Sequence, residues 1–181
     1  LDVGLPDAQV REHAALQRRG DTTAISRLHG TVLILFLGAG CLALLTAGVI
    51  ALLPTAELLD IPASAAPEFG PLLLLIGLIA FFSFVEIGVD GIFEGYQRYD
   101  MMNAIDAGWQ IVSAMAVVAA LSSGYGLIAL AVIKLTETAL GAATKFVFVR
   151  RVVPPDARPR LRFDARSFRS IRGYSLWNRL N

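Results

Sequence analysis

Long uncharged stretches, separated by short polar segments, dominate the pattern of hydrophobic and polar positions along this chain. The clearest one, residues 32–53, holds 22 residues without Asp, Glu, Lys or Arg. At 1.5 Å per residue a helix of that length extends about 33 Å, enough to cross a hydrocarbon core of roughly 30 Å. Comparable stretches follow it. We therefore predict four membrane-spanning helices, at about 32–53, 71–93, 104–121 and 126–149.

The segment Ser122–Gly126 (Ser-Ser-Gly-Tyr-Gly) decides whether the last two apolar stretches are separate spans. Residues 107–133 are uncharged, so one long helix is the alternative. Two glycines within five residues favour a reversal. The counts of Lys plus Arg agree: they are four, none, one, none and eight in segments 1–28, 54–70, 95–103, 122–126 and 150–172. This alternation is the positive-inside pattern of four spans with both ends in the cytoplasm.

Composition supports the same fold class. Charged residues make up only 17% of the chain and the mean hydropathy is +0.61, whereas soluble domains carry about 25% charged residues. The chain begins with Leu1 and ends within an apolar-aromatic pattern, so we expect a piece of a longer protein. The predicted fold is an all-α, polytopic helical membrane protein with four full transmembrane helices and partial helices at both ends.

The expected organisation has four parts. They are the end of a preceding helix with a cytoplasmic loop (1–28), the four-span bundle (29–149), a basic cytoplasmic linker with an interfacial helix (150–172) and the start of a truncated fifth span (173–181).

A charged stripe interrupts the second span. Glu86, Asp90, Glu94 and Arg98 are four residues apart, so on one continuous helix they share a face. Counted from Pro71, expected in the first turn of the span, Glu86 lies about 22 Å and Asp90 about 28 Å into the bilayer. For Glu94 and Arg98 an ion pair at the membrane interface is the expected role.

The last span contains Lys134 and Glu137, which at i and i+3 can pair on one face. Glu137 reaches nearly the depth of Glu86 on the neighbouring span. Ionisable residues inside a membrane are costly and usually functional. We therefore take Glu86, Asp90, Lys134 and Glu137 as candidates for a hydrated transport path. A structural salt-bridge network that fixes helix packing is the alternative.

Other chemistries lack a signature. His13 and His29 are isolated, and no metal-ligand spacing, phosphate-binding glycine loop or nucleophile motif occurs. We expect no enzymatic activity, no cofactor and no metal. The arginines after residue 150 are typical of a membrane exit and of contacts with lipid headgroups, so no nucleic-acid partner is expected.

Three short motifs resemble polysaccharide flippases of the O-antigen and teichoic-acid type. These flippases belong to the superfamily that also contains multidrug exporters and lipid II flippases. The motifs are Asp2-Val-Gly-Leu5 with Ala8 and Arg11, Glu94-Gly-Tyr-Gln-Arg-Tyr-Asp100 with Asn103, and Ser123-Gly-Tyr-Gly-Leu127. By that likeness the chain covers the end of helix two, helices three to six and the start of helix seven. The loop-motif residues taken from the resemblance are Glu94, Gly95, Gln97, Arg98, Tyr99 and Asp100.

The resemblance implies most of one lobe of a two-lobed transporter. Such a transporter flips a polyprenyl-diphosphate-linked oligosaccharide across the bacterial cytoplasmic membrane by alternating access. The implied partners are this lipid-linked oligosaccharide, membrane lipids and other membrane proteins of polysaccharide assembly. Two alternatives stay open, a cation-coupled multidrug exporter of the same superfamily and a non-transporting membrane scaffold.

Overall fold

The computed structural model describes residues 5–53, 62 and 66–170, and within this part of the chain the regular structure is helical. The elements are α1 (Leu5–Arg18), α2 (Thr22–Leu52), α4 (Ala66–Gly95), α5 (Tyr99–Ser122), α6 (Leu127–Val152) and the short 3₁₀ helix η1 (Pro155–Ala157). The start of the first motif at Asp2, most of the 54–70 connector and the expected fifth span at 173–181 lie outside the described residues.

Four of these helices, α2, α4, α5 and α6, are long and apolar enough to cross a membrane. They are 24 to 31 residues long, and each contains the main part of one expected span. This confirms the all-helical fold class and indicates a multi-pass membrane protein. Apolar side chains cover the outside of the bundle, and α5 contributes no buried residue at all. Such a surface suits contact with lipid.

The chain reverses between α5 and α6, so the alternative of a single long helix is wrong. Gly124 takes the left-handed conformation with φ +77°. Its amide donates to the Leu121 carbonyl at 3.1 Å, and the Tyr125 amide donates to the Ala120 carbonyl at 3.0 Å. These two bonds close a helix around a glycine that carries no steric penalty at positive φ. The glycines in the motif thus produce the predicted turn.

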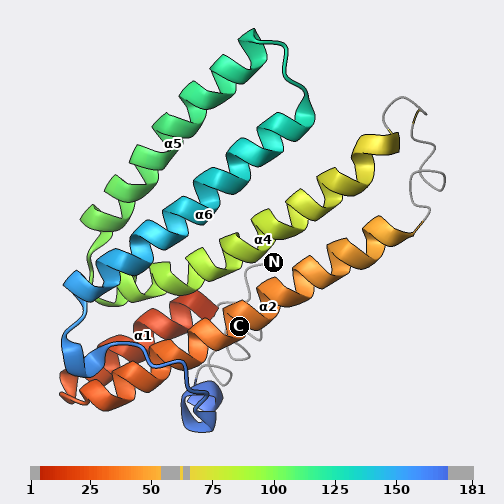
Figure 1. The fold of residues 1–181 in the computed structure, drawn as a ribbon. Coiled ribbons are helices and arrows are strands. Elements are labelled where there is room, and N and C mark those ends of the chain that lie inside the picture. Colours follow the sequence, from red (N-terminus) through yellow and green to blue (C-terminus); the bar gives the residue numbers. More distant parts are fainter. Residues whose placement is uncertain (1–4, 54–61, 63–65, 171–181) are drawn as a thin grey trace, which may run out of the picture.

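The four long helices form two antiparallel hairpins, α2 with α4 and α5 with α6, joined where α4 packs against α6 (Figure 1). The hairpins lie close together at the end that carries α1 and diverge toward the α5–α6 turn. Small residues let α2 and α4 approach each other. A Cβ added at Gly77 would lie 2.6 Å from the Ala47 Cβ, and one at Gly40 would lie 3.0 Å from the Phe81 carbonyl oxygen. Close approach at glycine is the usual way in which membrane helices pack.

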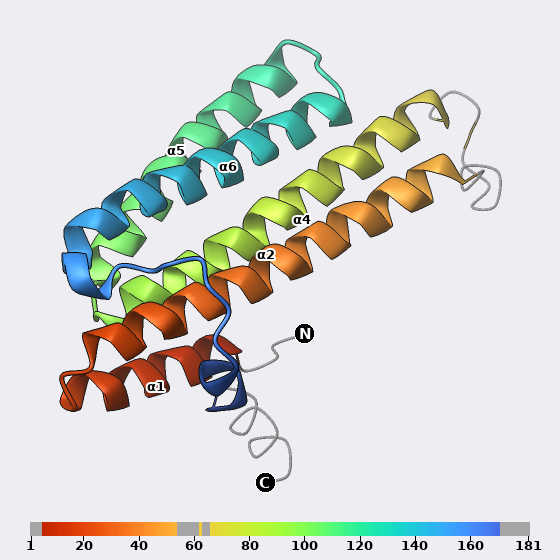
Figure 2. The ribbon, with the colours of Figure 1, turned by 60° about the horizontal axis from the view of Figure 1, so that its bottom comes forward.

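The buried core lies at the end where the hairpins converge. Val89, Ile92 and Phe93 of α4 are fully buried there, against Ile25 of α2 and Val149 of α6. Helix α1 lies alongside the same end, against α2 and α4 (Figure 2). The part of the bundle nearest the arginine-rich segments is therefore the most tightly packed one.

The predicted charged stripe does not extend to Arg98. Helix α4 ends at Gly95, where Gln97 takes φ 56° and the Arg98 amide donates to the Phe93 carbonyl at 2.8 Å. This left-handed residue turns the chain into α5, so Arg98 points away from the face that carries Glu86. Arg98 instead forms an ion pair with Asp100 at 3.1 Å. The expected pair of Glu94 with Arg98 is wrong for this reason.

The second span also begins earlier than predicted. Pro71 lies inside α4, which already starts at Ala66. Proline lacks an amide hydrogen and its ring crowds the carbonyl one turn earlier, so past the first turn Pro71 removes one backbone bond of α4 and strains the helix locally. Because proline prefers the first turn of a helix, the prediction put the start of this helix about one turn too late.

Cysteine labelling tests this topology. In a Cys41→Ser background we expect Ser123→Cys, at the exposed α5–α6 turn, to react with a membrane-impermeant thiol reagent added outside intact cells. Thr23→Cys, exposed at the start of α2, is the matched position on the opposite face and should react only after permeabilisation, because segments rich in arginine stay in the cytoplasm. The reverse pattern would contradict the assigned orientation.

Candidate functional site

A buried lysine joins three of the four long helices. Lys145 of α6 is 1% exposed, and its Nζ lies 2.9 Å from Glu86 Oε1, 2.7 Å from Asp90 Oδ1 and 2.7 Å from Asp106 Oδ1. Glu86 and Asp90 come from α4, one helical turn apart, and Asp106 comes from the first half of α5. One ammonium group therefore links α4, α5 and α6 through ion pairs, and its contact with Glu86 is also a charge-assisted hydrogen bond, which is stronger than a neutral one.

Next to this cluster lies a polar cavity of about 260 Å³. Its wall comes from α4, α5 and α6, and its lining residues are Glu86, Asp90, Asp106, Trp109, Gln110, Lys134, Glu137, Thr138, Gly141 and Lys145. The cavity lies within helices that are otherwise apolar, and its lining is almost entirely polar. We call it the charged cavity. Polar groups at this depth need either partners or water.

A second ion pair stands on the wall of the charged cavity. Lys134 Nζ donates to Glu137 Oε1 at 3.0 Å, as predicted from their spacing. The Lys134 side chain is 57% exposed and that of Glu137 is 14% exposed. Lys134 thus differs from Lys145, because one face of it remains open. The hydroxyls of Thr136 and Thr138 donate to backbone carbonyls of α6 one turn earlier. These hydroxyls thus bond to the backbone of their own helix rather than to groups in the cavity.

The four predicted path residues all line the charged cavity, and the predicted pair of Lys134 with Glu137 is present. Glu86 and Glu137 face the same space, yet Glu86 is bonded to Lys145 and not to the Lys134–Glu137 pair. Glu94, one turn beyond Asp90, is not among the lining residues. The salt-bridge network considered as the alternative is therefore divided between two adjacent clusters that share one cavity.

Sequence reasoning missed two members of the site, Lys145 and Asp106. A usable signal existed, because Lys145 is a single lysine in the apolar stretch that ends α6. It lies eleven residues after Lys134, which places both on one helical face. The Trp109 ring forms part of the cavity wall, and its Nε1 donates to Thr144 Oγ1 at 3.2 Å.

The loop motif Glu94–Asp100 lies apart from the charged cavity and shapes the α4–α5 turn. Arg98 binds both carboxylate oxygens of Asp100, at 3.1 and 3.3 Å. A Cβ added at Gly95 would lie 2.9 Å from the His13 ring, and Tyr96 packs edge-on against that ring with centroids 4.5 Å apart. In this structure the motif holds α1 against α4, which is a structural role.

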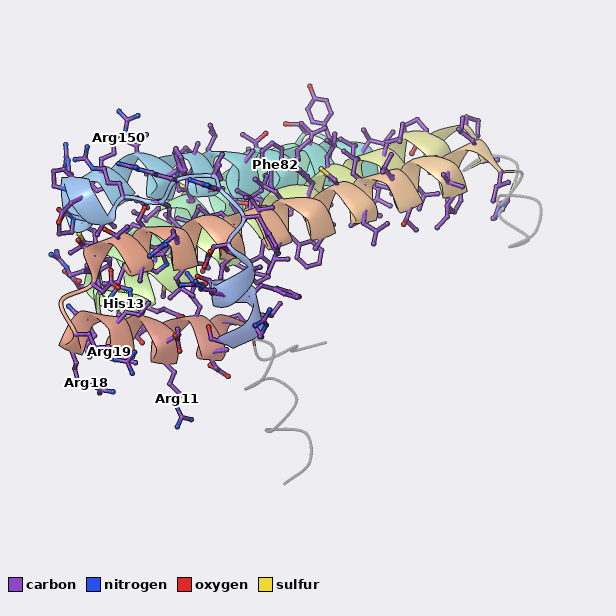
Figure 3. All side chains as sticks on the ribbon, turned by 90° about the horizontal axis from the view of Figure 1, so that it is seen from below. Arg11, His13, Arg18, Arg19, Phe82 and Arg150 are labelled. Atoms are coloured by element: carbon purple, nitrogen blue, oxygen red, sulfur yellow. The ribbon has the colours of Figure 1, made fainter. Side chains whose placement is uncertain are left out.

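A second polar cluster, between α1 and α2, was not predicted. Gln9 Nε2 lies 2.9 Å from His29 Nδ1, and His29 Nε2 lies 2.9 Å from His13 Nδ1. All three side chains are fully buried. Figure 3 shows His13 directed inward from α1, whereas Arg11 and Arg18 point away from the bundle. The two histidines taken as isolated in the sequence thus form a hydrogen-bonded chain that attaches α1.

This cluster makes stability depend on pH. Burial lowers the pKa of His13 from its ordinary value of 6.5. As pH falls through 6.5, the unfolded chain takes up a proton that folded His13 refuses, so the unfolded state binds more protons and stability falls. We expect the melting temperature to drop between about pH 7.5 and about pH 5.5. The drop should shrink in His13→Gln, and an unchanged slope in that variant would contradict this role.

Metal chemistry finds no support in the described part of the chain, where no group of three or more His, Cys, Asp or Glu side chains has the arrangement of a metal site. The carboxylates around Lys145 surround an ammonium group instead.

The charged cavity has an excess of negative charge. Its four carboxylates and two lysines give a net charge of −2 when all six are ionised. An uncompensated charge of this size is costly inside a membrane.

Comparison of the chain with protein-family models, with curated proteins and with solved structures gave no significant match.

Proposed function

We propose that this chain is part of a membrane transporter and that the charged cavity belongs to its substrate path. The observation that carries the proposal is a polar cavity of about 260 Å³ lined by residues of three helices, each apolar enough to span a membrane. Small-molecule sites usually measure about 300–1,000 Å³. A cavity of this size accepts part of a substrate. The remaining part of the substrate would contact portions of the protein other than the described residues.

The proposed cargo is a polyprenyl-diphosphate-linked oligosaccharide, flipped across the bacterial cytoplasmic membrane by alternating access. The lining suits sugar hydroxyls. Carboxylates such as Glu137 accept hydrogen bonds, the Gln110 amide both donates and accepts, and the Trp109 ring offers a flat apolar surface. Of the two lysines, Lys134 is the one with an exposed face, so it is the cation that would meet the diphosphate.

The acidic excess favours a second candidate, a cation-coupled multidrug exporter. A net charge of −2 in a low-dielectric wall attracts cations and repels a diphosphate. In the flippase the same excess would be balanced by protons or metal cations taken up together with the substrate. A non-transporting scaffold would also have its lysines paired with carboxylates. A transport measurement is therefore needed to distinguish the flippase, the exporter and the scaffold.

A reconstitution experiment separates the candidates. The full-length protein that we expect to contain this chain is placed in liposomes, and two cargoes are offered, a fluorescent polyprenyl-diphosphate-linked oligosaccharide and a fluorescent organic cation. We expect the oligosaccharide to change leaflets and the cation to stay outside. Transport of the cation alone would establish the exporter, and movement of neither cargo would favour the scaffold. Empty liposomes give the background for both.

A further inference from the structure

The basic linker after α6 is held against α2 as a strap, which we define as residues 158–170. The Ser26 hydroxyl donates to the Arg158 carbonyl at 2.6 Å, and the Asp164 amide donates to Thr31 Oγ1 at 3.0 Å. Between these anchors the Arg160 carbonyl touches Gly30 so closely that no Cβ would fit there. In Figure 2 the strap crosses α2 and ends beside α1. Its path is therefore fixed by Ser26, Gly30 and Thr31 of α2.

Two further features fix the conformation of the strap. Before it, Ala157 is 1% exposed and belongs to the buried core. In its middle Asp164 Oδ2 accepts from the Ser167 amide at 3.0 Å and from the Ser167 hydroxyl at 2.9 Å, and residues 165–170 are helical. These bonds lower the pKa of Asp164, so this N-cap stays ionised. The outward face of the strap is thus defined by the fold.

That outward face combines apolar and basic side chains. Leu161 is 66% exposed and Phe163 is 50% exposed, with the Phe163 ring 5.8 Å from that of Phe168. The exposed arginines of the strap are Arg158, Arg160, Arg162, Arg166 and Arg169. Large apolar groups held outward among arginines are typical of segments that lie in a membrane interface.

The level of the strap along α2 fits an interface. Its last anchor, Thr31, directly precedes the uncharged residues 32–53 that form the expected span. The strap therefore crosses α2 where the apolar stretch begins. At that level basic side chains meet lipid phosphates and apolar side chains reach the acyl boundary. A strap placed deeper would bury its arginines, and one placed further out would leave Leu161 in water.

We propose that the strap is a docking surface for anionic phospholipids in the cytoplasmic leaflet. Leu161 and Phe163 enter the interface, while the arginines on either side of them bind the anionic headgroups. The attraction depends on the sign of the lipid charge, because the strap carries five arginines and a single ionised carboxylate, that of Asp164, which is already bonded to Ser167. This inference does not depend on the cargo of the transporter. It assigns a lipid partner to a segment outside the charged cavity.

The test places a fluorescent probe on the strap. The full-length protein with Cys41→Ser and Leu161→Cys carries an environment-sensitive fluorophore at residue 161 and is placed in nanodiscs. The discs contain phosphatidylcholine alone or phosphatidylcholine with increasing phosphatidylglycerol. We expect a blue-shifted emission, and quenching by spin-labelled lipid, that grow with the anionic fraction. Both should weaken toward 1 M salt, where the screening length falls to about 3 Å.

Matched variants separate the strap from general charge effects. With Arg162→Gln the anionic fraction that gives half of the shift should rise, since each basic residue near an anionic surface changes the association constant roughly five-fold. Arg18→Gln removes the same charge from an α1 side chain that points away from the bundle (Figure 3) and should leave the midpoint unchanged.

Three results would overturn the proposal. The first is equal emission in neutral and anionic discs. The second is a blue shift without quenching by spin-labelled lipid, which would mean that protein covers the strap. The third is a shift in neutral discs on addition of inorganic phosphate alone, which would assign the arginines to a soluble anion. The lipid dependence of the parent protein decides the question even if a variant fails to fold.

Discussion

Replacing Lys145 with alanine is expected to lower the free energy of unfolding by about 3–5 kcal/mol, the usual cost of removing one partner from a buried ion pair. The reason is geometric. Lys145 is 1% exposed and is the shared partner of Glu86, Asp90 and Asp106. Without it, three carboxylates from two helices face one another with no cation between them. The melting temperature of the purified protein measures this loss.

Two further variants identify the cause of that loss. Lys134→Ala removes the same charge from a side chain that is 57% exposed, so its stability should change by less than about 1 kcal/mol. Lys145→Met combined with Glu86→Gln, Asp90→Asn and Asp106→Asn removes the whole charge cluster and should recover much of the lost stability. If Lys145→Ala melts at the same temperature as Lys134→Ala, the cluster does not hold the helices together.

Lys134→Ala is expected instead to reduce transport at least roughly ten-fold while the protein stays folded. Lys134 has the exposed face of its ion pair on the charged cavity, where water screens an orphaned Glu137. Losing one charge-assisted contact of about 1.5–3 kcal/mol with the diphosphate corresponds to a factor of about ten or more. Flipping in proteoliposomes measures the rate.

The double variant Lys134→Ala with Glu137→Ala distinguishes a path from a packing device. In a path, both variants keep their melting temperature and both lose transport. In a packing device, the single variant loses stability and the double variant regains it. The second pattern would mean that Lys134 and Glu137, like Lys145, stabilise the packing of the helices.

The fold was predictable because the bilayer constrains sequence strongly. Uncharged stretches such as 32–53 have to be helical when no water is present to bind the backbone. The glycines at Ser122–Gly126 correctly marked the reversal between α5 and α6. The end of α4 was harder, because Gln97 adopts a left-handed conformation that residues other than glycine seldom take. Spacing alone therefore extended the charged stripe as far as Arg98.

The site was only half predictable, for a different physical reason. Charge inside an apolar stretch identified Glu86, Asp90, Lys134 and Glu137, all of which line the charged cavity. The pairing depends on how α4, α5 and α6 are rotated against each other, and no spacing within one helix specifies that rotation. The buried chain of Gln9, His29 and His13 depends likewise on where α1 lies, which no local pattern specifies.

Substrate protection of a cysteine at Gln110 tests whether the charged cavity is a hydrated path. Gln110 lines the cavity and is exposed. Met115, on the same helix and 61% exposed, is an apolar control position that does not line the cavity. In the full-length protein with Cys41→Ser, we predict that Gln110→Cys reacts with a charged methanethiosulfonate reagent, that a lipid-linked oligosaccharide slows this reaction, and that Met115→Cys does not react. A cysteine at Gln110 that stays unreactive, or that reacts equally fast with and without the oligosaccharide, would contradict the proposed path.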